Sequence, residues 1–125
     1  MATETAIKID RVSSSRVEQA DLDNPGFGRI FSDHMFEMEY RDGQWHTPHI
    51  KPYGKIKVEP ALNVFHYGQA VFEGTKAYYV GDDTVNLFRP GQNIRRMAHS
   101  CRRLCIPEID PHLFLDAIEE LIRLD

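Results

Sequence analysis

Hydrophobic and polar positions divide the 125-residue chain into a polar beginning, a middle of short strand-like segments and a helical end. In the middle, residues 36–40 alternate apolar and acidic side chains. Such alternation is typical of a half-buried strand. Asp42-Gly43 then predicts a tight turn, and Trp45 begins the returning segment.

A second pair of strand-like segments lies further along the chain. Residues 76–80 and 84–88 have strand-like composition, and Gly81-Asp82-Asp83 between them predicts a turn. We therefore expect a second antiparallel hairpin. Residues 55–58 are a further short strand candidate, whereas residues 63–72, which are rich in aromatic side chains, are ambiguous.

The spacing becomes helical after Pro90-Gly91. Residues 92–105 carry apolar side chains at intervals of three and four, which predicts a helix with one buried face. That face consists of Ile94, Met97, Ala98, Cys101, Leu104 and Cys105. Pro107 is expected to end the helix.

A second helix is predicted from Asp110 onward, because Asp110 suits the N-cap and Pro111 the first helical position. Its inward side chains would be Phe114, Ala117, Ile118, Leu121 and Ile122. Since strands precede helices, the expected fold class is α+β, an antiparallel sheet with helices packed on one face. The chain reaches Asp125 without a stop signal for this helix, so we expect an interrupted domain.

Composition and charge are those of an ordinary globular domain. Hydrophobic residues make up 42% and charged residues 27% of the chain. The net charge of -4 disfavours nucleic acid and anionic membranes as partners. A secretory signal and a membrane helix are not expected, which favours the cytoplasm. Residues 1–27 are interpreted as a loose polar arm with one short strand, and residues 28–125 as the folded domain.

Cys101 and Cys105 lie about one helical turn apart. Their position on the apolar face predicts two reduced thiols on the buried side of the helix. A disulfide across one turn is geometrically unfavourable, and a metal site would require further ligands. His46 and His49 are separated by Pro48, which disfavours a helical ligand pair, so no metal site is predicted.

Arginine pairs recur along the first predicted helix. Arg95 and Arg96 return seven positions later as Arg102 and Arg103, on nearly the same sides of the helix. Arg96 and Arg103 would point away from the apolar face. This pattern fits a solvated basic face, and it also fits an anion site, because guanidinium donors match phosphate oxygens. A nucleic-acid site is disfavoured by the acidic balance of the chain.

Residues 65–74 form the most unusual segment, with three aromatic side chains, two glycines and a glutamate. Glycine permits tight turns or the close approach of a ligand. The residues alone leave two interpretations open, an aromatic pocket or an aromatic core.

Several short motifs occur in order from about Gly28 to the end of the chain. They are FSDHM at 31–35, PHIKP at 48–52, FHYG with VFEGTKAY between 65 and 78, and LFRP with NIRRM between 87 and 97. Their order and spacing resemble those of branched-chain amino acid aminotransferases, pyridoxal-phosphate enzymes of fold type IV. The resemblance implies the small domain of that fold.

The resemblance implies roles for particular residues. Arg96 corresponds to the arginine that binds the phosphate of pyridoxal 5′-phosphate. Tyr67 and Phe72 correspond to aromatics that line the pocket for the aliphatic side chain of the substrate, and in some relatives the tyrosine serves the neighbouring subunit. Gly74 lies in the same loop, where backbone groups approach the substrate. Lys76 stands where some relatives carry arginine and receives no catalytic role.

The resemblance also implies that this chain lacks its catalytic centre. In the family, the lysine that attaches the cofactor and the acidic partner of its pyridinium nitrogen lie in the large domain, beyond residue 125. No catalytic residue is therefore predicted here, since no lysine of the chain lies in a motif that matches the one around the cofactor-attaching lysine. The lysines are Lys8, Lys51, Lys55, Lys57 and Lys76. The chain alone is expected to be inactive.

The parent protein implied by the resemblance is a homodimeric, cytoplasmic transaminase of branched-chain amino acid biosynthesis. It would move the amino group of leucine, isoleucine or valine to 2-oxoglutarate. Two alternatives remain open. One is a D-amino acid transaminase or an aminodeoxychorismate lyase on the same fold, against which the DHM and PHIKP motifs argue. The other is a non-catalytic module for binding or subunit association.

Overall fold

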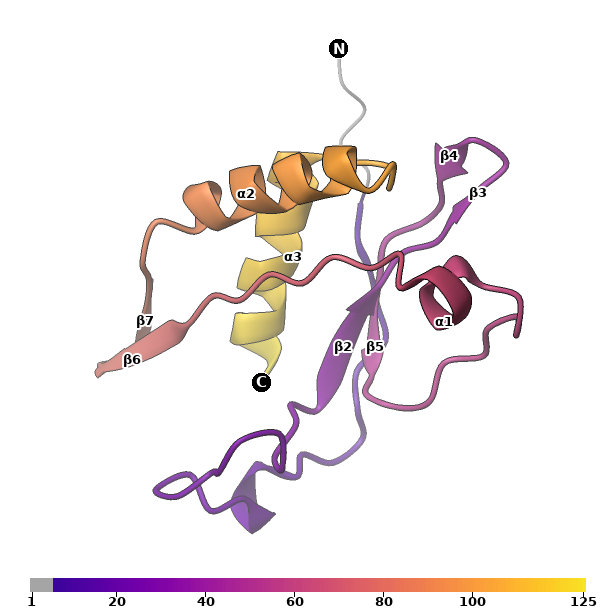
Figure 1. Ribbon diagram of the computed structural model, residues 1–125. Coiled ribbons are helices and arrows are strands. Elements are labelled where there is room, and N and C mark those ends of the chain that lie inside the picture. Colours follow the sequence, from indigo (N-terminus) through magenta and orange to yellow (C-terminus); the bar gives the residue numbers. More distant parts are fainter. Residues whose placement is uncertain (1–5) are drawn as a thin grey trace. The chain divides into compact units, whose positions relative to one another are not determined.

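The computed structural model describes residues 6–125, so residues 1–5 of the predicted arm 1–27 lie outside the described residues. The chain divides into two compact units. We call residues 6–56 together with Ala117–Asp125 the N-terminal unit, and Lys57–Asp116 the central unit. Figure 1 labels their helices and strands, and both units combine the two kinds of element. The predicted α+β class is confirmed.

The core of the N-terminal unit lies around β5 (His49–Pro52). β2 (His34–Glu37) pairs with β5 in antiparallel orientation, and β1 (Lys8–Ile9) pairs with it in parallel. Ile50 and Pro48 are the largest fully buried side chains of the described residues. The arm therefore contributes a strand, β1, beside the strand that carries the fully buried Ile50. A short 3-10 helix, Val17–Gln19, follows it.

The first predicted hairpin is present as β3 (Tyr40–Arg41) and β4 (Gln44–Trp45). Its turn residues Asp42 and Gly43 have φ angles of 55° and 79°. Positive φ at both central positions suits the twist of a two-residue hairpin, as the Asp-Gly pair predicts. The single strand expected over 36–40 is divided, because β2 ends at Glu37 and β3 begins at Tyr40.

Buried His34 joins three segments of the N-terminal unit. Its Nε2 accepts the backbone N–H of Val12 at 3.0 Å, so the ring proton lies on Nδ1. Nδ1 lies 2.5 Å from Asp125 Oδ1, and the backbone N–H of His34 donates to Asp125 Oδ2 at 3.0 Å. These bonds connect the arm, β2 and the residue that follows α3.

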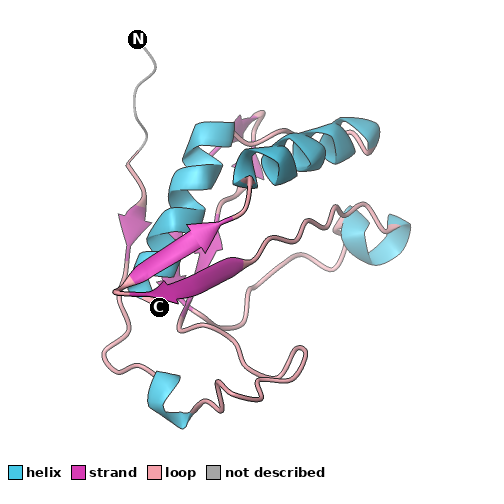
Figure 2. Ribbon diagram, turned by 90° about the vertical axis from the view of Figure 1, so that its left-hand side faces the viewer, coloured by secondary structure: helices cyan, strands magenta, loops and turns pink. Residues whose placement is uncertain are grey.

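In the central unit, the second predicted hairpin is confirmed as β6 (Ala77–Gly81) and β7 (Thr84–Leu87), shown as paired strands in Figure 2. A short helix, α1 (Asn63–Tyr67), occupies part of the ambiguous segment and ends at Gly68, whose φ is 62°.

The prediction of a strand at 55–58 is wrong. These residues pair with no strand in the described part of the chain, and Ile56 and Val58 are exposed.

The strands of residues 6–125 form separate small sheets rather than one continuous antiparallel sheet. Two longer helices follow the strands along the chain, as the α+β pattern predicts. α2 (Pro90–Arg103) and α3 (Pro111–Leu124) each occupy a predicted helical segment. None of the helices in this part of the chain is long and apolar enough to cross a membrane.

The apolar face of α2 is confirmed along most of its length. Ile94, Met97, Ala98 and Cys101 border the same residual space, of about 10 Å³, as Ile109 and Phe114. This space is at the lower limit of what a water molecule needs, which indicates close packing. The predicted N-cap of α3 is also confirmed, because Asp110 Oδ1 accepts the N–H groups of His112 and Leu113, each at 2.9 Å.

α2 ends earlier than the apolar pattern predicts. Cys105 has a left-handed φ of 52°. Its N–H donates to Arg102 O at 3.3 Å, and the N–H of Ile106 donates to Cys101 O at 2.9 Å. These paired bonds are those of a Schellman motif, which ends the helix before Pro107. The prediction of two buried thiols is therefore correct for Cys101 and wrong for the exposed Cys105; both are free.

The left-handed residue at the end of α2 generates a stability prediction. Cys105→Gly should raise the free energy of unfolding by up to about 1 kcal/mol, because glycine adopts positive φ without the steric penalty of a Cβ. Urea unfolding would measure this as a higher midpoint with an unchanged slope. Cys105→Ala is the control, since it also removes the thiol but keeps the Cβ, and an equal gain in both variants would contradict the explanation.

Candidate functional site

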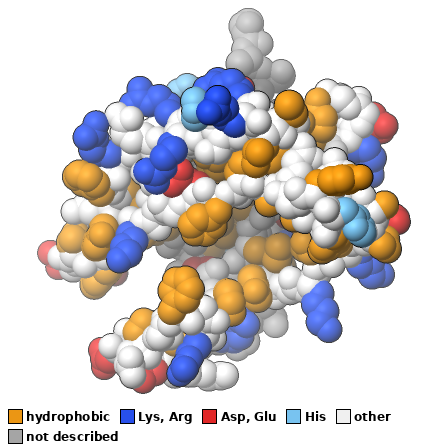
Figure 3. Space-filling model, viewed as in Figure 1, with side chains coloured by type: hydrophobic (Ala, Val, Ile, Leu, Met, Phe, Trp, Pro, Cys, Tyr) orange, Lys and Arg blue, Asp and Glu red, His pale blue; other side chains and the backbone are white. Residues whose placement is uncertain are grey.

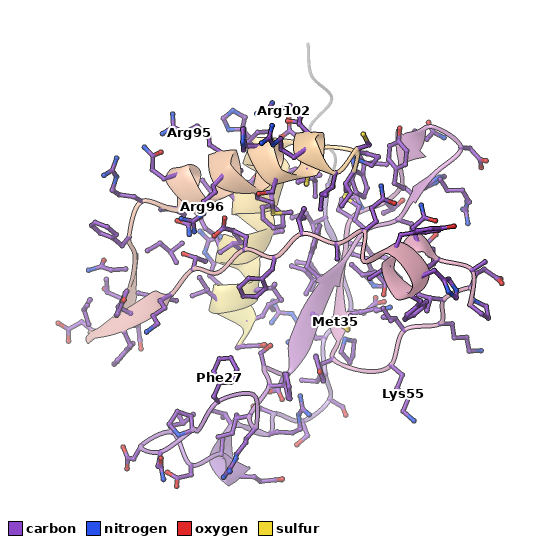
Figure 4. All side chains as sticks on the ribbon, viewed as in Figure 1. Phe27, Met35, Lys55, Arg95, Arg96 and Arg102 are labelled. Carbon is purple, nitrogen blue, oxygen red and sulfur yellow. The ribbon has the colours of Figure 1, made fainter. Side chains whose placement is uncertain are left out.

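The central unit contains a two-point ion pair between Glu73, which lies between α1 and β6, and Arg96 of α2. Arg96 Nε donates to Glu73 Oε2 at 2.8 Å, and Arg96 Nη2 donates to Glu73 Oε1. The carboxylate thus lies along the side edge of the guanidinium, formed by Nε and Nη2. Figure 4 shows Arg96 reaching from α2 toward this segment, while Arg95 and Arg102 lie on the other side of the helix.

The two partners differ strongly in exposure. The side chain of Glu73 is 12% exposed, whereas that of Arg96 is 68% exposed. A guanidinium carries five N–H groups, and the pair with Glu73 uses Nε and one hydrogen of Nη2. Within residues 6–125, the described bonds of Arg96 leave its end edge, formed by Nη1 and Nη2, open. Arg96 is therefore held on one edge and accessible on another.

Glu73 also fastens its own segment to the first turn of α2. Its Oε1 accepts the backbone N–H of Gly74 at 3.0 Å and Asn93 Nδ2 at 3.3 Å. The same Nδ2 group donates to the carbonyl oxygen of Gly74 at 2.7 Å. We call Glu73, Gly74, Asn93 and Arg96 the Glu73 network.

The start of α2 explains why two of its residues reach the same carboxylate. Arg89 adopts a left-handed conformation at the N-cap, with φ of 51°, and Pro90 takes the first helical position. The N–H of Gln92 donates back to Arg89 O at 2.9 Å. Asn93 and Arg96 are three residues apart in the helix and so lie on one side of it.

The network lowers the pKa of Glu73 from its ordinary 4.5 to about 2. The hydrogen bonds from Arg96 are the main cause, and those from the Gly74 N–H and Asn93 add to it, against the effect of burial. Glu73 in turn raises the pKa of Arg96. Both side chains are therefore charged throughout the neutral range.

An open hollow of about 430 Å³ lies beside the network. It is lined by Gly74, Thr75, Lys76, Tyr78, Phe88 and Asn93. Two of these residues, Gly74 and Asn93, belong to the Glu73 network, so the hollow and the ion pair share a wall. Among residues 6–125, no group of three or more histidine, cysteine, aspartate or glutamate side chains is arranged to hold a metal ion.

The residues singled out from the sequence are distributed unevenly around this site. Arg96 and Gly74 both belong to the Glu73 network. The Phe72 ring lies near Gly74, since a Cβ on that glycine would be 3.7 Å from Phe72 Cζ. Tyr67 is the last residue of α1 and lies outside the network.

The aromatic side chains of this segment are on the surface of the chain. Phe72 is 92% and Tyr67 is 82% exposed, and Phe65 is exposed as well. The interpretation of the segment as an aromatic core is therefore wrong for this chain. Figure 3 shows hydrophobic side chains spread among the charged ones on the visible face of the molecule.

The sequence interpretation missed two members of the network, Glu73 and Asn93. Glu73 is the only acidic residue between Glu59 and Asp82, so it stands out in an otherwise acid-free stretch that precedes an arginine-rich helix. That contrast is a usable signal for an ion pair. Asn93 carries no such signal, because its two bonds depend on the extended segment lying alongside the first turn of α2.

The sequence matches no protein-family model. It is 49% identical over 109 residues to branched-chain-amino-acid transaminase 1 of Bacillus subtilis. This match covers 86% of this chain and 31% of that protein. Branched-chain-amino-acid aminotransferase 2 of the same organism is 44% identical over 98% of this chain and 34% of its own length. The branched-chain-amino-acid aminotransferase of Mycolicibacterium smegmatis is 41% identical over 90% of this chain and 31% of its own length.

The chain that carries the anchored, exposed Arg96 is therefore similar in sequence to aminotransferases along most of its length. The chain is similar to proteins that are all named branched-chain-amino-acid transaminases or aminotransferases. It spans about a third of the length of the curated relatives it matches.

The ion pair predicts a particular dependence of stability on pH. Because the pKa of Glu73 in the fold, about 2, is below its ordinary 4.5, the charged carboxylate stabilises the fold at neutral pH. This contribution is complete above the ordinary pKa and is lost as the pH falls from about 4.5 toward 2. Urea unfolding at a series of pH values should show the decline, and Glu73→Gln should make it shallower. An equally steep decline in the variant would contradict the assignment.

Proposed function

We propose that this chain is the N-terminal small domain of a branched-chain amino acid transaminase that uses pyridoxal 5′-phosphate. The whole enzyme would transfer the amino group of leucine, isoleucine or valine to 2-oxoglutarate. Relatives with that name match 86–98% of the chain. The structural observation that carries the proposal is Arg96, which is fixed on one edge by Glu73 and exposed on the other.

The residues present suit the phosphate of the cofactor. The open edge of Arg96 offers the parallel N–H donors that bind two phosphate oxygens at once. When bound, the cofactor supplies an electron sink for bond breaking at the α-carbon of the amino acid. The contribution of this chain is to hold and orient the phosphate end of the cofactor, and the catalytic lysine and the acidic partner of the pyridinium nitrogen come from the large domain.

The exposed aromatics suit the side chains of the proposed substrates. Leucine, isoleucine and valine are recognised by shape and by burial against apolar surface. Phe72 and Tyr67 would provide part of such a surface, and their exposure in this chain leaves their rings available to a ligand. Gly74 would bring backbone groups close to the substrate, because it carries no side chain.

The remaining features of the proposal concern the organisation of the whole protein. Residues 1–27 form its N-terminal arm and residues 28–125 its small domain. The enzyme is a homodimer in the cytoplasm, it acts in branched-chain amino acid biosynthesis, and its partners are small amino and 2-oxo acids rather than nucleic acid or membranes.

The activity test compares the natural protein that carries this sequence with the 125-residue chain. With leucine, 2-oxoglutarate and pyridoxal 5′-phosphate, the natural protein should form glutamate, measured by a coupled dehydrogenase assay. The chain alone should not, because it lacks the lysine that attaches the cofactor. An inactive natural protein would favour a binding or association module, whereas activity with D-amino acids alone would assign it to another enzyme of the same fold.

The phosphate assignment predicts the effect of Arg96→Met on the natural protein. Affinity for pyridoxal 5′-phosphate should fall about tenfold or more, since a hydrogen bond to a charged group contributes about 1.5–3 kcal/mol. Fluorescence titration of the apoenzyme measures the change. Arg95→Met is the matched control, because that residue lies outside the Glu73 network, on the other side of α2. Equal losses in both variants would contradict the assignment.

A further inference from the structure

We propose that Glu73 is a positioning residue that holds Arg96 in the orientation required for end-on binding of the cofactor phosphate. The inference rests on the proposed function and adds Glu73 to the residues that serve the phosphate site. Glu73 would not touch the cofactor. It would act through Arg96, by occupying the side edge of the guanidinium and leaving the end edge for the phosphate.

The guanidinium of Arg96 has two edges that can each bind an oxyanion. Glu73 receives Nε and Nη2 of Arg96, and these two donors form the side edge. The end edge, formed by Nη1 and the outer hydrogen of Nη2, also matches a bidentate oxyanion. One arginine can therefore bind the carboxylate and a phosphate at the same time, so the phosphate need not displace Glu73.

Glu73 is itself held in place. Its Oε1 accepts from the Gly74 N–H and from Asn93 Nδ2, and its side chain is mostly enclosed. Arg96 is long, flexible and mostly exposed, so it would otherwise sample many rotamers. A fixed carboxylate at its side edge removes most of that freedom before any ligand arrives, which is preorganisation.

The charge of Glu73 makes the inference testable by the sign of an effect. A carboxylate close to a phosphate repels it, so removal of the charge alone would strengthen phosphate binding. Removal of a positioning contact would weaken it. A residue that merely competed with the phosphate for Arg96 would also give stronger binding when neutralised.

The experiment uses the natural protein as apoenzyme and measures dissociation constants for pyridoxal 5′-phosphate and for pyridoxal, which lacks the phosphate. For Glu73→Gln, we expect affinity for the phosphorylated form to fall about tenfold, with little change for pyridoxal. The ratio to compare is the dissociation constant for pyridoxal divided by that for pyridoxal 5′-phosphate, and it should fall in the variant. This ratio isolates the phosphate, because a general loss of structure would lower both affinities. Inorganic phosphate, added as a competitor of pyridoxal 5′-phosphate, should also bind the variant more weakly than it binds the wild-type protein.

Two further variants sharpen the result. Asn93→Ala removes a neutral side chain that holds Glu73, and should lower the same ratio by a smaller factor; it also serves if Glu73→Gln does not fold. Glu108→Gln is the matched control. It breaks an ion pair with Arg102, which lies in α2 as Arg96 does, and it should leave the ratio unchanged.

The outcomes separate this inference from the proposed function. If the wild-type protein prefers pyridoxal 5′-phosphate and Arg96→Met removes that preference, the proposed phosphate site stands. An unchanged or higher ratio in Glu73→Gln would then overturn the positioning role alone. If the wild-type protein binds the two compounds equally, both proposals fail.

Discussion

The central unit depends on the enclosure of one carboxylate. Glu73 is nearly covered, and a covered charge is tolerated only when its oxygens are fully paired. Two donors from Arg96, the backbone of Gly74 and the amide of Asn93 meet that requirement. The same bonds hold an extended segment without regular structure against α2. The hollow beside β6 shares Gly74 and Asn93 with this network, and Arg96 remains largely exposed next to it.

The elements that the sequence predicts correctly are those specified by neighbouring residues. The turn at Asp42-Gly43 requires positive φ, which Asp and Gly adopt most readily. The N-cap at Asp110 is likewise a contact between near neighbours. Residues 55–58 fail because a strand exists only when another strand pairs with it. The end of α2 is missed because Cys105, a residue without a turn preference, adopts a conformation that usually indicates glycine.

The candidate site was predictable in part, for a similar reason. Helical spacing correctly separates Arg96 from the buried face of α2, and the resemblance to aminotransferases predicts a role for it. Its partner lies 23 residues away in the sequence, and no periodicity relates the two positions. The spacing of arginines therefore fits a solvated basic face equally well. What distinguishes the alternatives is a contact between segments, which requires the fold.

The pairing of β1 with β5 has a consequence for the order in which the N-terminal unit assembles. A parallel pair cannot be closed by a short turn, so the chain must first traverse β2, β3 and β4. Closing such a long loop carries an entropy cost that a local hairpin avoids. We therefore expect the β3–β4 turn to form early and Lys8–Ile9 to join β5 late. The first strand in the chain would be among the last to find its place.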